Sequence, residues 1–157
     1  PGPPGWRAHE TQMEETWLVV GLGNPGDSYR KTRHNVGFAV LDELASRHGV
    51  SLRSKRFKAV FGKGRVAGRQ VLLTKPQTYM NRSGDSVGVM AGWHRIPAER
   101  ILVVHDDLAL PLGRLTLKAG GGHGGHNGLR DLQRGLGSGE FLRVRVGIGR
   151  PVVHDEA

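Results

Sequence analysis

The chain has 157 residues, the length of one domain, and its 23 Lys and Arg against 14 Asp and Glu give a formal charge of +9. Apolar residues make up 37% of the chain and 25 glycines add to them, which is the composition of a globular protein and excludes a disordered one. The absence of cysteine excludes disulfides, thiolate zinc sites and a cysteine nucleophile, and no apolar run approaches the length of a membrane-spanning helix.

The charge is unevenly distributed along the chain. No acid occurs between Glu43 and Asp85, whereas the same interval contains ten Lys and Arg residues. A long span of one sign predicts a polyanionic partner, because Lys and Arg that contact phosphates release condensed counterions. The alternative is a solvated basic surface that serves solubility.

The first half of the chain predicts a leader, a strand and a helix. Residues 1–16 begin with Pro-Gly-Pro-Pro-Gly and show no hydrophobic period, so we expect a flexible leader. The β-rich run 17–21 predicts a buried strand that ends in a loop at 24–26. From about Thr32, apolar residues recur at helical spacing and predict a helix that Gly49 stops.

The middle of the chain predicts a hairpin followed by a second helix. Residues 57–66 and 69–74 alternate in hydrophobicity around Ala67-Gly68, which is typical of two strands joined by a tight turn. Ser83 is expected to cap a helix that runs to about His94.

The remaining residues alternate between strands and a helix. The apolar run 101–105 predicts a strand that ends abruptly at Asp106-Asp107. A strand over 114–118, a glycine loop over 120–125, a short amphipathic helix over 129–136 and a last strand over 141–147 follow. Strands that alternate with helices predict a single three-layer α/β domain with helices on both faces, and the hairpin makes its mostly parallel sheet a mixed one.

The spacing Gly21-x-Gly23-x-x-Gly26 after the first strand matches the dinucleotide-binding fingerprint. In that fingerprint the third glycine lies in the opening turn of a helix. Here Pro25 precedes it and the helical period starts only near Thr32. We therefore assign these glycines to a turn, and a nucleotide cofactor site is the less favoured interpretation.

His34 and Asp106 are candidates for acid–base chemistry. His34 lies near the start of the first predicted helix, where the helix dipole disfavours the imidazolium and leaves a neutral base. Asp106 follows an apolar strand and could accept the other ring N–H, which would fix the tautomer. The structural alternative is a capped helix start and an Asx turn.

Three of the four asparagines stand in loops or at helix starts. Asn24 follows the first strand, Asn81 precedes Ser83, and Asn127 closes the glycine loop. Carboxamides can position an amide-containing substrate or support an oxyanion without carrying charge. The alternative for each of them is a local turn or cap.

Other types of site are disfavoured by spacing. The residues that suggest a metal site are His105, Asp106, Asp107, His123 and His126, but they match no metal-binding motif, and a metal site is the weaker interpretation. Neither a Gly-x-Ser-x-Gly elbow nor a Walker lysine occurs, which disfavours serine hydrolysis and nucleoside triphosphate chemistry. With these alternatives disfavoured, the expected chemistry is attack by a water molecule that a base activates.

Four long motifs, in order, carry a family resemblance. They are VVGLGNPG at 19–26 with Tyr29 and TRHNVG at 32–37, KPQTYMNRSG at 75–84, VHDDL at 104–108 with LPLG at 110–113, and GGGHGGHNGL at 120–129. Over about 17–151 the chain closely resembles the bacterial-type peptidyl-tRNA hydrolases. The resemblance implies cleavage of the ester between a peptide and the terminal ribose of tRNA, which recycles tRNA from prematurely released chains, with no metal or organic cofactor.

The resemblance also implies catalytic roles. It makes His34 the base that activates water and Asp106 the group that supports it. Asn24 would distinguish peptidyl-tRNA from unblocked aminoacyl-tRNA. Asn81 would position the substrate and steady the oxyanion, and Asn127 would hold water or the peptide backbone.

A second set of residues would bind the substrate. By resemblance this set is Tyr29, Tyr79, Met80, His126, Lys118 and Arg145. The two tyrosines would line the site and contact the terminal nucleotide or the peptide. Lys118 and Arg145 match positions that clamp phosphates of the tRNA end.

The expected boundaries are a leader over 1–16, a catalytic domain over 17–151 and a short tail over 152–157. Members of the family continue past Pro151 through a lid-like loop and a final amphipathic helix, whereas this chain stops at Ala157. We therefore expect weakened tRNA affinity or stability. A noncatalytic RNA-binding module that keeps the fold is the alternative function, and a metal-dependent phosphoesterase is a more distant one. The expected partner is peptidyl-tRNA, bound by a monomer with no membrane contact, in the cytoplasm or the mitochondrial matrix.

Overall fold

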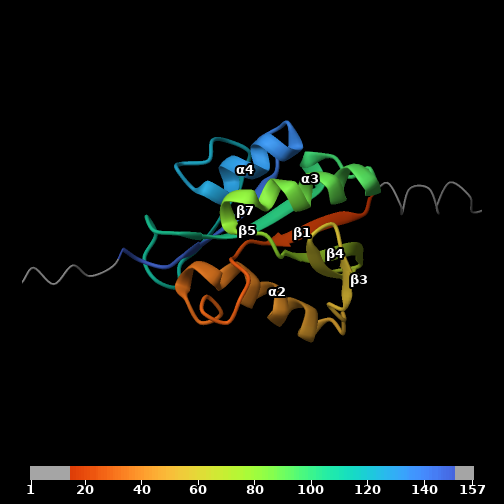
Figure 1. Cartoon of the computed structure of the whole chain (residues 1–157), viewed down its shortest axis with the longest axis horizontal. Coiled ribbons are helices and arrows are strands. Elements are labelled where there is room, and N and C mark those ends of the chain that lie inside the picture. Colours follow the sequence, from red (N-terminus) through yellow and green to blue (C-terminus); the bar gives the residue numbers. More distant parts are fainter. Residues whose placement is uncertain (1–14, 151–157) are drawn as a thin grey trace, which may run out of the picture.

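The computed structural model describes residues 15–150 as seven strands in one sheet, with helices on both of its faces (Figure 1). The strands are β1 (Trp17–Gly21), β2 (Ser54–Arg56), β3 (Ala59–Val66), β4 (Arg69–Pro76), β5 (Ile101–Asp107), β6 (Leu115–Ala119) and β7 (Leu142–Gly147). The α-helices are α2 (Val36–Arg47), α3 (Ser83–His94) and α4 (Asn127–Leu136), and three 3-10 turns are η1 (Arg33–Asn35), η2 (Met80–Arg82) and η3 (Ala98–Arg100). Most of the expected leader and all of the expected tail lie outside the described residues.

The sheet is mixed, and its strand order is β2-β3-β4-β1-β5-β7-β6. β1 pairs parallel with β4 and β5, and β5 pairs parallel with β7. The pairs β2–β3, β3–β4 and β6–β7 are antiparallel. Strands β2, β4, β1, β5 and β7 therefore run in one direction, which confirms the predicted mixed, mostly parallel sheet. The carboxyl ends of β1 and β5 meet at one edge of the sheet.

Alternation along the buried strands builds a core on each face. Leu18 and Val20 of β1 pack in the cluster that contains residues of α3 and α4, whereas Val19 packs in the cluster that contains residues of α2. Figure 1 shows the same arrangement, with α3 and α4 on one side of the sheet and α2 on the other. The three-layer prediction is therefore confirmed. Among residues 15–150 there is no helix with the length and apolar character that a membrane span requires.

Two local predictions differ from the structure. β2 was not predicted, because its sequence Ser-Lys-Arg is fully exposed and has no apolar alternation. Ser83 was expected to cap α3, but it is the first residue of the helix, and its hydroxyl donates to the carbonyl of Met80. The prediction of this cap is wrong because the 3-10 turn η2 leads directly into α3.

Glycine lets α2 approach the ends of two strands. A Cβ added at Gly37 would overlap the carbonyl oxygens of Leu22 and Val104, which are backbone atoms that cannot move aside. We expect Gly37→Ala to lower the free energy of unfolding by roughly 1–3 kcal/mol or more, because overpacking a close contact forces backbone shifts. Urea unfolding measures this change.

Gly92→Ala is the matched control for that substitution, because Gly92 also lies in a helix but has open space around its Cβ position. We expect it to raise stability slightly, since alanine is the better helix former. Equal effects of the two substitutions would contradict the close-approach argument.

Glycines also bring α3 and α4 together. A Cβ at Gly88 would lie 2.6 Å from the carbonyl oxygen of Gly135, and one at Gly135 would lie 2.5 Å from that of Gly84. The backbone N–H of Gly84 donates to Oδ2 of Asp131 at 2.6 Å. The two helices therefore touch through their backbones, which fixes the positions of Asn81 and Asn127 just before and at their N-terminal ends.

Candidate active site

His34 and Asp106 meet at the carboxyl edge of the sheet. Asp106 lies near the end of β5 and is only 5% exposed, and His34 lies in η1. Nδ1 of His34 is 2.6 Å from Oδ2 of Asp106, although 72 positions separate the two residues. The His34 side chain is 57% exposed, so its ring combines a buried anchor with access to solvent.

Asp106 holds a second histidine with its other oxygen. Nε2 of His126 is 2.7 Å from Oδ1 of Asp106. Nδ1 of His126 accepts the backbone N–H of Leu129 at 3.1 Å and thereby caps α4. A backbone N–H can only donate, so Nδ1 of His126 is unprotonated and Nε2 carries the proton that it donates to Asp106.

The carboxyl of Asp106 is held in its ionised form. Burial opposes ionisation, but the hydrogen bonds from His126 and His34 outweigh it and lower the pKa of Asp106. A carboxylate only accepts hydrogen bonds, so His34 also donates to it, through Nδ1–H. The neutral His34 ring therefore carries its lone pair on Nε2, where a general base needs it.

Asn24 is held by a network of amides. The carboxamide of Asn35 accepts the backbone N–H of Asn24 and donates to its carbonyl, both at 2.8 Å. Oδ1 of Asn24 accepts the backbone N–H of Met80 at 2.6 Å. Its oxygen therefore already accepts one backbone N–H, whereas its NH₂ group forms no hydrogen bond within residues 15–150 and is the donor that Asn24 can offer to a ligand.

Asn81 and Asn127 line one cavity of about 310 Å³. They come from η2 and from the first residue of α4, and both are exposed. Arg130 and Arg134 line the same cavity, and Arg134 is tied to Asp131 at 2.8 Å. Asp131 lines it as well, so the structure brings together two of the three predicted asparagines beside Arg130 and a paired Arg134–Asp131.

The predicted tyrosines also lie together. The rings of Tyr29 and Tyr79 are 6.5 Å apart in an edge-to-face arrangement, and the two residues are 37% and 61% exposed. Met80, next to Tyr79, reaches the start of α4, since its sulfur lies 2.7 Å from the position of a Cβ on Gly128. Tyr79 therefore connects the exposed aromatic pair to Met80, whose backbone N–H donates to Asn24.

Lys118 and Arg145 line a second cavity, of about 640 Å³, which Asp106 and His126 also line. Nε of Arg145 donates to Oδ2 of Asp107 at 2.7 Å. Burial raises the pKa of Asp107, but the hydrogen bonds from Arg145 and from the N–H of Ala109 outweigh it and lower the pKa overall. Arg145 is therefore already paired, whereas Lys118 forms no ion pair within residues 15–150.

His105 lies behind His126 and is almost fully buried, at 3% exposure. Its Nδ1 donates to the backbone carbonyl of Asp106 at 2.8 Å, and its ring is 4.9 Å from that of His126 in an edge-to-face arrangement. Burial lowers the pKa of His105 to about 4 and outweighs the opposing effect of the hydrogen bond to the Asp106 carbonyl. The site thus keeps an uncharged imidazole packed against His126.

The low pKa of His105 predicts acid sensitivity of the fold. An unfolded histidine titrates near pH 6.5 and folded His105 near pH 4, so the unfolded state binds more protons in between. We expect stability to fall as the pH drops from 6.5 to 4, by up to roughly 3 kcal/mol from this group. Urea unfolding at pH values across this window should show a smaller fall for His105→Gln. His48→Gln is the control, because His48 is exposed, and it should lose stability as steeply as the wild type. An equally steep fall for His105→Gln would contradict the assignment of this pH dependence to His105.

Sequence reasoning did not assign two of these contacts. Asn35 received no role, although it lies within the TRHNVG motif at a helix start, where an asparagine side chain can bond to nearby backbone groups. His126 was assigned to the substrate, yet both of its ring nitrogens bond within the protein. Its place directly before a helix is the signal for a cap. Within residues 15–150, no group of three or more His, Asp or Glu side chains is placed to hold a metal ion.

Comparison with known proteins gives one consistent result. A family model described as Peptidyl-tRNA hydrolase matches residues 18–157. A protein named peptidyl-tRNA hydrolase from Geotalea daltonii is 54% identical over 138 residues, which cover 88% of this chain and 72% of that protein. A chloroplastic peptidyl-tRNA hydrolase from Arabidopsis thaliana is 50% identical over 94% of this chain and 52% of its own length. The crystal structure of peptidyl-tRNA hydrolase from Acinetobacter baumannii superposes with a TM-score of 0.83 at 45% identity, over 90% of this chain and 72% of that one.

Proposed function

This chain belongs to the peptidyl-tRNA hydrolase family, and we propose that its His34–Asp106 pair activates the water that cleaves the ester between peptide and tRNA. The chain is accordingly a hydrolase of peptidyl-tRNA. The observation that carries the proposed mechanism is the 2.6 Å contact between a buried carboxylate and a solvent-accessible imidazole.

The proposed reaction has two steps. Nε2 of His34 takes a proton from water while the water oxygen attacks the ester carbonyl carbon, which forms a tetrahedral intermediate. Asp106 stabilises the imidazolium that develops on His34. The intermediate then breaks the bond to the ribose oxygen, and His34 returns its proton to that oxygen. The products are a peptide with a free carboxyl group and a tRNA with a free terminal hydroxyl.

The free NH₂ group of Asn24 supports a role in choosing the substrate. A peptidyl ester carries an amide carbonyl next to its last residue, and this carbonyl can accept a hydrogen bond from Asn24. An unblocked aminoacyl ester lacks this carbonyl and has a charged amino group instead, which only donates, so the NH₂ donor of Asn24 is left without an acceptor. A binding site discriminates strongly against a ligand that leaves one of its hydrogen-bond donors unpaired.

The remaining roles rest on position. We assign Asn81 to the oxyanion and Asn127 to water or the peptide backbone, because both line one cavity and Asn127 lies at the positive end of α4. Lys118 could pair with a phosphate of the tRNA end. Arg145 would have to give up its bond to Asp107 before it could bind a phosphate. His126 is better assigned as a positioning residue that holds Asp106.

Hydrolysis of a blocked aminoacyl-tRNA tests the function. We expect an N-acetylated aminoacyl-tRNA to be cleaved and the unblocked form to be spared, with a chelator present or absent. Binding without cleavage would favour the noncatalytic RNA-binding module, which the family membership does not favour. Loss of activity with the chelator would favour a metal-dependent phosphoesterase. The monomeric state, the domain boundaries and the compartment, cytoplasm or mitochondrial matrix, stay predictions.

A further inference from the structure

The exposed face of α3 carries two large apolar side chains in the second half of the helix. Val89 is 56% exposed and Trp93 is 62% exposed, and their spacing of four residues places them on one face. Arg82 ends the 3-10 turn η2 just before α3 and follows Asn81 directly. The rise of α3 separates Asn81 from Trp93 by about 18 Å.

Trp93 is the centre of a stacked group. The guanidinium carbon of Arg56 lies 4.3 Å from the centroid of the Trp93 ring and 4.8 Å from that of Phe57, within the range of cation–π contacts. The Phe57 ring lies 6.1 Å from Trp93 and 5.7 Å from His94. These neighbours orient the Trp93 ring while more than half of its surface stays open to solvent.

The turn between β2 and β3 adds unpaired charge to this group. Lys55, Arg56 and Lys58 are exposed, and in the part of the chain that the structure describes none of them forms an ion pair. Phe57 and Lys58 have φ values of +57° and +53°. Side chains other than glycine rarely adopt this conformation, and it costs energy. The turn therefore presents an aromatic ring and a cation where glycine would be easier to accommodate.

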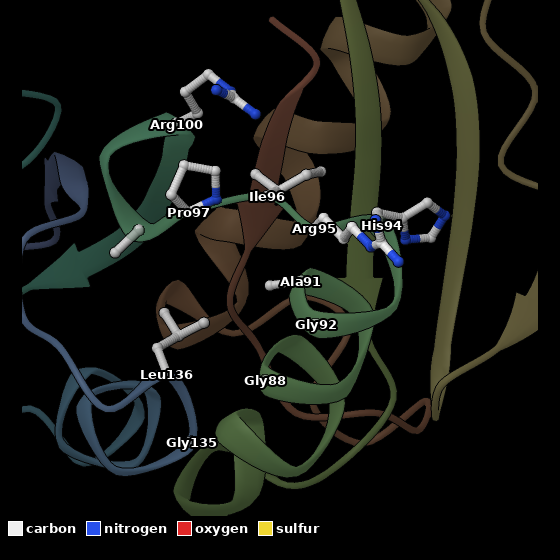
Figure 2. Close-up of a pocket in the computed structure, with 11 residues that line it drawn as sticks. Gly88, Ala91, Gly92, His94, Arg95, Ile96, Pro97, Arg100, Gly135 and Leu136 are labelled. Carbon is white, nitrogen blue, oxygen red and sulfur yellow. The ribbon is translucent and has the colours of Figure 1, made fainter. Parts of the chain in front are cut away.

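A cavity of about 740 Å³ opens beside His94 and Arg95 at the end of α3 (Figure 2). The second half of α3, the end of α4, residues 95–98 and Arg100 line it. Its charged lining residues are Arg95 and Arg100, and no acidic residue is among the described residues that line it. His94 belongs both to the cavity and to the stack on Phe57, so the two features are continuous.

We propose that this region binds the body of the tRNA substrate beyond its terminal nucleotide. The Trp93 surface, as we name it, consists of Arg56, Phe57, Lys58, Trp93, His94 and Arg95. An unpaired base or a ribose packs on the open face of Trp93, and phosphates pair with Lys58 and Arg95. The inference rests on the proposed function, because the tRNA is the anchored substrate that reaches this surface.

The composition of the Trp93 surface favours RNA over a protein partner. An exposed aromatic ring beside cations, with no acid between them, is the combination that binds nucleic acid strands through base stacking and phosphate contacts. The nearest acid on the exposed face of α3 is Asp85, which Arg134 already neutralises at 2.6 Å. α3 itself begins two residues after Asn81, so a strand whose end is bound at the active site can extend along this helix toward Trp93.

Kinetics on two substrates test the proposal. One substrate is a peptidyl-tRNA, and the other is the peptidyl ester of a single nucleoside, which cannot span about 18 Å. We expect Trp93→Ala to raise KM for peptidyl-tRNA by roughly 5–100-fold, to leave kcat unchanged, and to leave the nucleoside ester unaffected. Trp93→Phe keeps a ring and should recover most of the affinity. Lys58→Gln should lower the salt dependence of tRNA binding by about one counterion.

Arg69→Gln is the matched charge control, because Arg69 is exposed at the opposite end of the β3–β4 hairpin. An equal rise in KM on both substrates, or no change on either, would overturn the proposal and leave the proposed function standing. Binding of an acidic peptide to this surface without competition from tRNA would overturn it in favour of a protein partner. No cleavage of either substrate by the wild-type chain would instead reject the proposed function. Thermal unfolding of each variant checks that it folds.

Discussion

His34→Ala is expected to lower kcat for peptidyl-tRNA hydrolysis by roughly 10²–10⁴-fold, the contribution of a well-placed general base. KM and the affinity for uncharged tRNA should change little, because the substitution removes the proton acceptor and leaves the phosphate-binding side chains in place. The 57% exposure of the His34 side chain means that little packing is lost, so the fold should persist.

Single-turnover measurements separate this effect from binding and product release. His48→Ala is the matched control, since His48 is exposed and follows α2 at its other end. Turnover by His34→Ala within a few-fold of the wild type would show that another group activates the water.

Asp106→Asn is expected to lower kcat as much as His34→Ala does, by about 10²–10⁴-fold, through the wrong tautomer. An asparagine offers one oxygen and one NH₂ group to two rings that both donate. The cap on Leu129 fixes His126 as the Nε2–H form, so the oxygen must face His126. The NH₂ group then faces Nδ1 of His34, which moves the ring proton to Nε2 and removes the base.

Nitrogen chemical shifts of the His34 ring measure this exchange of tautomers directly. The double variant His34→Ala/Asp106→Asn should be no slower than either single variant, because the two residues act as one unit. Asp42→Asn is the control, as Asp42 is an exposed carboxylate paired with Lys75. A kcat above one tenth of the wild type in Asp106→Asn would contradict the tautomer argument.

The fold was largely predictable because its signals are local. The apolar run of β1 and the helical spacing before Gly49 each reflect one element packing on one face, and both elements were predicted correctly. β2 was missed because its residues are exposed and its pairing depends on β3. The glycine pattern at 21–26 was assigned to a turn, but only Gly26 starts one. Gly21 ends β1 and, like Gly23, lies close against α2, where a Cβ would overlap Gly37 or Phe38.

The residue types of the site were predictable, but the hydrogen bonds that connect them were not. His34 and Asp106 were placed together by chemical reasoning, and the structure brings them into contact. That Asp106 also binds His126 could not be read from spacing, because it depends on how α4 packs on the sheet. The link from Asn35 to Asn24 was hidden for a similar reason, since a loop folds back on itself there.

The three groups that meet at Asp106 have a consequence for refolding. His34 and Asp106 are 72 positions apart, and His126 lies a further 20 positions along the chain. Contacts between such distant segments form late, because closing long loops costs entropy before any contact compensates. Recovery of activity after dilution from urea should therefore lag behind recovery of helical circular dichroism, which makes turnover a reporter of the last step of assembly.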